Sequence, residues 1–145
     1  YPLTEEEIYQ LDLDSFGYSI SSHPIAKYRS RLNRKIIFAK DIQKYDRKSV
    51  YLLGIYIARK ESLTNKSEPM EFLTLEDETD TYECILFPDV YKKFSDLVHW
   101  ESLFIVKGKV DQSFGFYNII IEKMASIEQW INQLENRKNH IKYVI

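Results

Sequence analysis

The chain has 145 residues, of which 44% are hydrophobic and 14% aromatic, enough to bury the core of one domain with an appendage. Its formal net charge of -2 excludes a chain that binds nucleic acid through overall positive charge, so such a role requires local basic patches. The single Cys84 excludes an internal disulfide and indicates a reducing compartment. No apolar run is long enough to predict a membrane span, and Tyr1 in place of a Met indicates a piece of a longer protein.

Residues 1–49 are predicted to form a helical connector. Thr4 and Glu7 fit a capping box at the start of one helix, which Gly17 ends. Pro24 marks the start of a second helix, in which Ile25, Tyr28, Arg29 and Leu32 recur at helical spacing. Because the connector has no core of its own, we expect it to pack loosely on the rest of the chain.

From residue 50 the hydrophobic pattern changes to the period of strands. Five strands are predicted, at 50–62, 70–77, 81–87, 102–110 and 116–124. Gly54, inside the first of them, predicts a bend or a close approach of another segment, and Gly115 is the expected turn residue between the last two. An amphipathic helix is predicted at 89–98, after Pro88.

Three strands, a short helix and two further strands is the element order of an OB-fold, a five-stranded Greek-key barrel, although SH3-like barrels share much of it. We therefore expect a mainly β domain over residues 50–125. The remaining residues, 126–145, are predicted to form a C-terminal helix with a tail, because Ile127, Trp130, Ile131 and Leu134 have helical spacing.

Two stretches resemble the bacterial C-family DNA polymerases, the DNA polymerase III alpha subunits. In their OB domain a strand ending in Leu-Glu-Asp precedes a strand ending in Phe-Pro and a helix with a Tyr, as in residues 68–94 here. Their connector carries a Gly-aromatic step and a Ser-x-His-Pro motif. The matching residues are Leu75, Glu76, Asp77, Phe87, Pro88 and Tyr91 in the barrel, and Phe16, Gly17, Tyr18, Ser21, His23, Pro24, Tyr28 and Arg29 in the connector.

The resemblance implies an OB module that guides single-stranded template DNA in a bacterial, cytoplasmic DNA polymerase, a nucleotidyltransferase. The connector then looks like a hinge from a helix-hairpin-helix region, and the partners are single-stranded DNA, other polymerase domains and replisome proteins. The catalytic carboxylates belong to a palm domain that this chain lacks, so the fragment itself is expected to be neither an enzyme nor a cofactor-binding protein. We expect it to be monomeric.

Single strands cross the second and third strands of an OB barrel, with bases on aromatic rings and phosphates on lysines and arginines. The candidate stacking residues are Tyr56, Phe72, Phe114, Phe116 and Tyr117. The candidate phosphate-binding residues are Arg59, Lys60, Lys66, Lys107 and Lys109. Phe72 is exposed if its neighbours Leu73 and Leu75 enter the barrel. Each aromatic residue fits the barrel core or rim about equally well, and each charge also fits a solvated surface position.

Other polar residues are given structural interpretations. Glu76, Asp77, Glu78 and Asp80 gather in one turn and are predicted to be solvated turn residues rather than a metal site. His23 is expected to stabilise the turn at Pro24. Cys84, in the middle of a strand, is expected to be buried and unreactive. No catalytic or metal-binding residue is assigned.

The residues leave two alternatives open. The loop "SLTNKSEP" at 62–69 has one lysine and no glycine, whereas the family often has both, which favours a protein-interaction OB domain. An anticodon-type RNA-binding OB domain shares the barrel but leaves the His-Pro connector unexplained.

Overall fold

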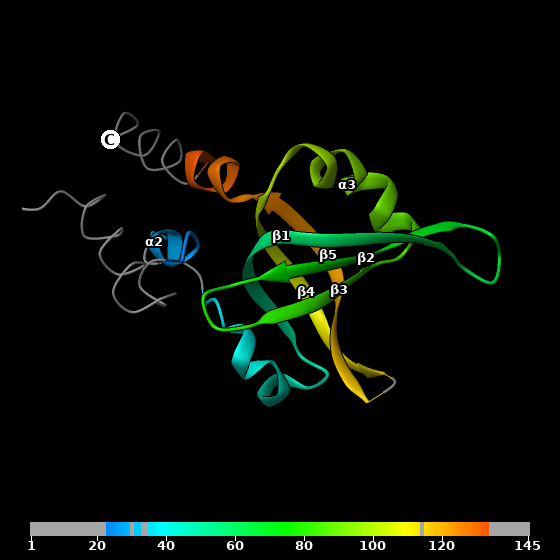
Figure 1. Ribbon diagram of the computed structural model, residues 1–145, viewed down its shortest axis with the longest axis horizontal. Coiled ribbons are helices and arrows are strands. Elements are labelled where there is room, and N and C mark those ends of the chain that lie inside the picture. The colour runs from blue at the N-terminus through cyan, green and yellow to red at the C-terminus, as the bar shows by residue number, and fades with distance from the viewer. Residues whose placement is uncertain (1–22, 30, 33–34, 114, 134–145) are drawn as a thin grey trace, which may run out of the picture.

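A closed barrel of five strands forms the centre of the computed structural model, in the order β1-β2-β3-β5-β4 (Figure 1). The strands are β1 (Ser49–Leu63), β2 (Pro69–Glu76), β3 (Thr81–Leu86), β4 (Leu103–Ser113) and β5 (Phe116–Ser126). The structure describes residues 23–29, 31–32, 35–113 and 115–133, so the helix predicted from Thr4 lies outside the described residues.

The length of β1 allows the barrel to close. Its first half, Ser49 to Ile55, pairs with β4, and its second half, Ile55 to Leu63, pairs with β2. All pairings are antiparallel except that of β3 with β5, which is parallel and completes the ring. The predicted five-stranded Greek-key barrel of the OB type is confirmed.

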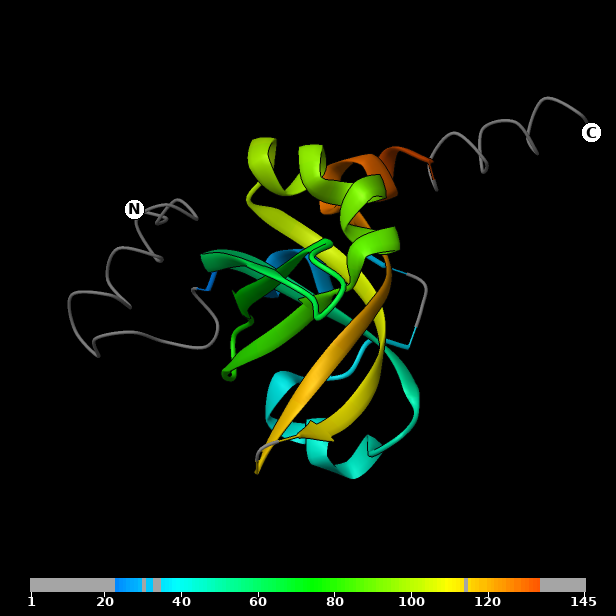
Figure 2. The same cartoon turned by 90° about the vertical axis from the view of Figure 1, so that its right-hand side faces the viewer.

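Two helices cover opposite ends of the barrel (Figure 2). One is α3 (Pro88–Trp100), which follows β3 as predicted; the other is the 3-10 helix η2 (Ala39–Tyr45), which the sequence did not predict. Val98 of α3 and Ile42 of η2 pack into the same core as the inward side chains of the strands. Among the described residues, no helix is both long and apolar enough to cross a membrane.

Gly54 and Cys84 behave as the sequence predicts. A Cβ atom on Gly54 would lie 2.6 Å from the Tyr82 hydroxyl and 2.7 Å from Cβ of Leu75, so the close approach is real. That hydroxyl donates a 2.7 Å hydrogen bond to the carbonyl oxygen of Leu53. Cys84 is fully buried in the barrel, and burial raises the pKa of its thiol well above the ordinary range. At Gly115 the φ angle of 82° confirms the predicted turn.

A second, smaller core lies outside the barrel. Ile25, just before α2 (Ala26–Arg29), is 0% exposed and packs with Leu53 of β1 and Ile105 of β4. The cluster also contains Ile127 and Ile131 from a helical segment that the structure describes at 127–133. The expected C-terminal helix is confirmed, but loose packing is wrong for the described part of the connector around Ile25, because this segment shares a core with the barrel.

Arg29 fastens the connector to the β2–β3 turn. Its Nε donates a 3.0 Å hydrogen bond to Oε2 of Glu78, and its Nη2 donates to Oε1 of Glu78 and to Oδ2 of Asp77, 3.3 Å away. Asp77 is 1% exposed and Glu78 is 7% exposed. The prediction that these turn acids are solvated is therefore wrong for Asp77 and Glu78, because Arg29 and backbone donors take the place of water.

His23 holds the neighbouring turn, as predicted. Its Nδ1 accepts a 3.1 Å hydrogen bond from the backbone N–H of Ile25, across Pro24. Its Nε2 lies 3.0 Å from Oε1 of Glu76 at the end of β2. The His-Pro motif thus gives the connector a second contact with the β2–β3 turn.

We predict that Arg29→Met lowers the free energy of unfolding by about 3–5 kcal/mol, because it leaves two buried carboxylates without their cation. Lys27→Met, which removes an exposed charge from the same helix, is the control and should change stability little. Urea denaturation of both variants measures the difference.

The pH dependence of Arg29→Met gives a second readout. Burial would raise the pKa of the Glu78 carboxyl, but hydrogen bonds from Arg29 and from the Glu78 backbone outweigh it and lower that pKa. The wild-type chain therefore loses this stabilisation as pH falls through the lowered pKa. Without Arg29, burial dominates, so the variant should instead gain stability as the pH falls from neutral. Parallel pH profiles would contradict the assigned ion pair.

Candidate nucleic-acid interface

A groove of about 610 Å³ runs along the outside of the barrel between β2, β3 and the β4–β5 hairpin. We call it the aromatic groove. The apolar side chains that line it come from both sides, and they include Phe72, Ile85, Phe87, Phe116, Tyr117 and Ile120. Phe116 is 71% exposed and Phe87 is 44% exposed, so their rings are available to a ligand.

Strand register places one continuous row of side chains across this groove. Lys60 of β1 lies opposite Phe72 of β2, which lies opposite Ile85 of β3. Ile85 pairs with Ile120 of β5, which in turn lies opposite Lys109 of β4. With neighbouring strands about 4.8 Å apart, the two lysines stand about 19 Å from each other around the barrel, with an apolar surface between them.

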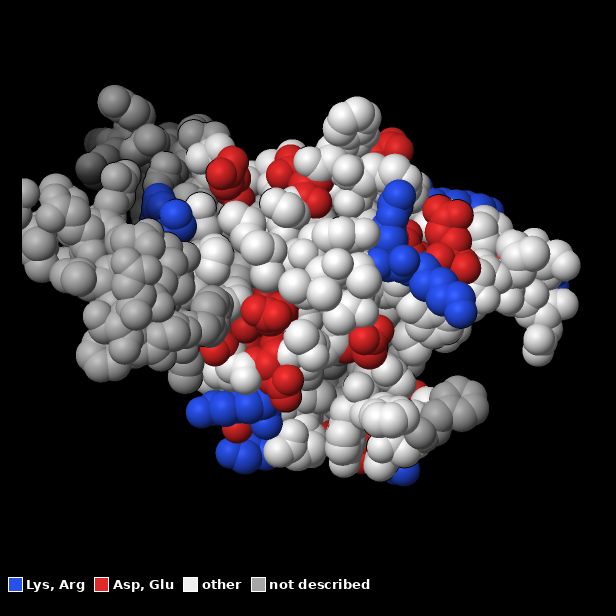
Figure 3. Space-filling view, in the orientation of Figure 1, with Lys and Arg blue, Asp and Glu red and all other residues white. Residues whose placement is uncertain are grey.

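The adjoining row is polar and partly acidic. Thr74 pairs with Glu83, whose neighbour on β5 is Asn118, and Asn118 pairs with Asp111. The Thr74 hydroxyl donates a 2.8 Å hydrogen bond to Glu83. No lysine or arginine of the described residues lines the aromatic groove itself. Figure 3 shows white and red atoms in the middle of this face, with blue atoms toward its right-hand and lower-left margins.

Five of the predicted interface residues come together on this face. Phe72, Phe116 and Tyr117 line the aromatic groove, and Lys60 and Lys109 stand at the two ends of the row through Phe72. Phe72 is half-buried on the outward face of β2 because, as predicted, Leu73 and Leu75 take the inward positions and are fully buried.

The other five do not line the groove or are not described. Tyr56 packs against the barrel core, and Arg59 turns toward α3, where its Nη1 lies 2.7 Å from Nδ1 of His99. Lys66 is exposed in the β1–β2 loop, and Lys107 lies in a different groove. Phe114 lies outside the described residues.

Phe87 is a groove residue that the site prediction missed. The outward positions of β3 are Thr81, Glu83 and Ile85, and Phe87 continues that alternation one step past the end of the strand. The period-two pattern of β3 is the sequence signal that identifies Phe87 as an outward residue.

Residues 54–127, just over half of the chain, match the family described as OB-fold nucleic acid binding domain. The chain belongs to this family. The matched range lies close to the predicted barrel domain, and it includes all five strands in whole or in part.

Curated relatives confirm the polymerase resemblance of this OB-fold chain. DNA polymerase III subunit alpha of Aquifex aeolicus is 26% identical over 140 residues, covering 91% of this chain and 12% of that protein. The same subunit of Halalkalibacterium halodurans is 30% identical over 142 residues, covering 97% of this chain and 12% of that protein. The chain thus spans about 12% of the length of these relatives, and the matches extend beyond the barrel into the connector.

Among solved structures, a putative aspartyl-tRNA synthetase from Leishmania major shares the fold. It superposes with a TM-score of 0.52 at 16% identity, over 66% of this chain and 21% of the synthetase. At this identity the similarity supports the OB-fold and nothing further.

Glu71 is a buried carboxylate that sequence reasoning did not single out. It faces inward from β2, opposite Glu61 of β1, and it is 0% exposed. Neither of its carboxylate oxygens has a hydrogen-bond partner among the described residues. Burial, together with the charge of Glu61, raises the pKa of this carboxyl, although Arg59 and His99 act in the opposite direction.

We predict that Glu71→Gln stabilises this OB-fold domain at neutral pH. Because the pKa of the Glu71 carboxyl is raised in the folded state, its charged form lowers the free energy of unfolding. This loss of stability is complete above the raised pKa and absent below about pH 4.5, the ordinary pKa of the group. The variant should therefore exceed wild type in the free energy of unfolding at neutral pH and converge with it in acid. Glu68→Gln, an exposed position, is the control. A loss of stability at neutral pH would show that the charged carboxylate has a partner in the folded chain.

Proposed function

We propose that this chain is the single-stranded DNA-binding module of a DNA polymerase III alpha subunit and that it guides the template strand. The observation that carries the proposal is the aromatic groove with a lysine at each end of its central row. OB barrels bind single strands by base stacking on such rings and by phosphate contacts to flanking cations.

The charges of the groove determine the orientation of the strand. Glu83 and Asp111 in the groove repel phosphates, so the bases turn inward onto Phe72 and Phe116 while the backbone runs along the outside. Lys60 and Lys109 then meet the backbone at the two margins. Three or four nucleotides bridge that span, near the lower end of the site sizes known for OB-folds.

The module supplies binding and no chemistry, while the parent chain would carry the polymerase activity. Its partners are then the single-stranded template, neighbouring polymerase domains and replisome proteins, in the bacterial cytoplasm. As a separate fragment it is a monomer, with the described connector residues 23–29 and 31–32 held on the barrel by Arg29 and Ile25.

A protein-docking role is the second candidate, and the lack of a basic side chain lining the described groove favours it. An apolar segment with a positive charge suits a groove with exposed Phe87 and Phe116 and two carboxylates. The two functions differ in their response to salt, since only phosphate binding releases counterions from the ligand.

We predict different effects from substitutions of a ring and of a cation. Phe72→Ala should weaken binding to labelled single-stranded DNA by about 1–3 kcal/mol for each base lost from the ring, with little change in salt dependence. Lys60→Ala should flatten the plot of log affinity against log salt concentration by about 0.7, as should Lys66→Ala if the strand reaches the β1–β2 loop. Fluorescence anisotropy at several salt concentrations measures both effects.

Lys40→Ala is the matched control, because Lys40 is exposed on η2 at the far end of the barrel from α3. No binding at low salt and high protein concentration would favour the protein-docking function. If neither Phe72→Ala nor Lys60→Ala changes the affinity or its salt dependence, the strand binds elsewhere on the molecule.

A further inference from the structure

A second groove, of about 420 Å³, lies where β1, β4 and β5 meet α3 and the helical segment at 127–133. We call it the basic groove. Three lysines from three different elements line it, namely Lys93 of α3, Lys107 of β4 and Lys123 of β5. None of them lines the aromatic groove. Lys107, a phosphate contact predicted from the sequence, lies in this second groove and does not line the aromatic groove.

Lys107 and Lys123 are directly opposite each other on paired strands. Like charges in such positions destabilise a sheet, so the pair has an electrostatic cost that an anion between them would relieve. Glu122 is the acidic residue lining the groove, and its Oε2 lies 3.9 Å from the ammonium of Lys107. Its other oxygen accepts a 2.7 Å hydrogen bond from Ser49. One partly exposed glutamate therefore does not neutralise the three lysines.

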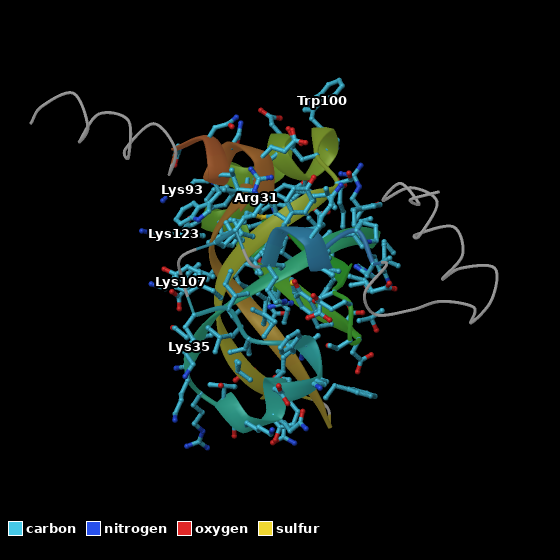
Figure 4. All side chains as sticks on the ribbon, turned by 90° about the vertical axis from the view of Figure 1, so that its left-hand side faces the viewer. Arg31, Lys35, Lys93, Trp100, Lys107 and Lys123 are labelled. Carbon is cyan, nitrogen blue, oxygen red and sulfur yellow. The ribbon has the colours of Figure 1, made fainter. Side chains whose placement is uncertain are left out.

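The cations continue beyond the groove. Figure 4 shows Lys93, Lys123, Lys107 and Lys35 one below another along one side of the molecule. Lys35 precedes Ile36, which forms a bridge to Tyr51 of β1, and Tyr51 lies opposite Lys107. Such a file of cations matches the repeating charge of a phosphodiester backbone better than it matches a single anion.

The floor between these cations is apolar and aromatic. It is formed by Tyr51, Phe94, Ile105, Ala125 and Trp130. The Lys107 ammonium lies 5.8 Å from the centre of the Tyr51 ring. Rings beside cations suit a ligand that alternates flat apolar groups with phosphates, as a single strand of nucleic acid does.

We propose that the basic groove binds the phosphodiester backbone of single-stranded nucleic acid, at a site separate from the aromatic groove. Lys107 and Lys123 share one phosphate, Lys93 contacts the next, and sugars and bases cover the floor at Tyr51 and Trp130. This assignment does not depend on whether the aromatic groove binds DNA.

The test uses the whole chain and a long single-stranded oligothymidylate with iodouracil substitutions. Ultraviolet cross-linking followed by mass spectrometry should identify adducts on the peptides containing Tyr51 and Trp130. The double variant Lys107→Gln/Lys123→Gln should lose these adducts and, because the two lysines share one phosphate, should flatten the dependence of log affinity on log salt by about 0.7. Because the variant removes a repulsive pair, it should fold at least as well as wild type.

Lys40→Gln/Lys44→Gln removes the same charge from η2 and should retain both the adducts and the salt dependence of wild type, apart from a small long-range effect. Phe72→Ala should also retain the adducts at Tyr51 and Trp130, whatever it does to adducts in the aromatic groove. If the aromatic groove does not bind DNA, the adducts that are missing should be those on peptides containing Phe72, Phe116 or Tyr117.

Three results would overturn the proposal. The first is the absence of adducts on the Tyr51 and Trp130 peptides of the wild-type chain. The second is equal behaviour of the two double-lysine variants. The third is loss of those adducts when polyglutamate is present during irradiation at matched charge concentration, which would assign the groove to an acidic protein segment.

Discussion

The carboxylate of Asp77 is the group on which the rest of the arrangement depends. One of its oxygens accepts hydrogen bonds from the backbone N–H groups of Thr79 and Asp80, at 2.7 Å and 3.1 Å, and so closes the β2–β3 turn. The other accepts from the N–H of Ala39 at 2.7 Å and from Arg29. Because Asp77 is buried, it needs all of these donors, and their presence joins a turn, the start of η2 and the connector at one point.

The contacts of Asp77 fix the position of the connector and thereby which part of the barrel surface it covers. With Arg29 held at the turn, Ile25 packs on the outward side chains Leu53 of β1 and Ile105 of β4, and the segment at 127–133 joins the same cluster through Ile127 and Ile131. Outward side chains of β2 and β3 line the aromatic groove, and the basic groove lies beside the second core. The connector thus limits where nucleic acid can lie without contacting it.

The sequence predicted what depends on local periodicity. Period-two alternation located all five strands, and Phe72 emerged as an outward residue because Leu73 and Leu75 had to face inward. It could not predict Asp77 and Glu78, since a turn rich in acids looks the same whether water or an arginine 48 or 49 residues away satisfies it. The helix η2 was missed because a short 3-10 segment shows no hydrophobic period. The different positions of Lys107 and Lys109 depend on the bulge in the β4–β5 pairing, which no periodicity records.

That bulge explains why Lys107 and Lys109 belong to different surfaces of this barrel. Lys107 pairs with Lys123 while the next residue, Gly108, pairs with Ile121, so Glu122 is the extra residue on β5. On one side of the bulge, Lys109 pairs with Ile120 in the row that continues to Phe72. On the other side, the paired residues Lys107 and Lys123 line the basic groove. Lys107 and Lys109 are outward neighbours on β4, about 7 Å apart along the strand, close to one nucleotide step. A chain with a net charge of -2 thus still places two neighbouring cations on one strand, Lys109 at the end of the row through Phe72 and Lys107 in the basic groove.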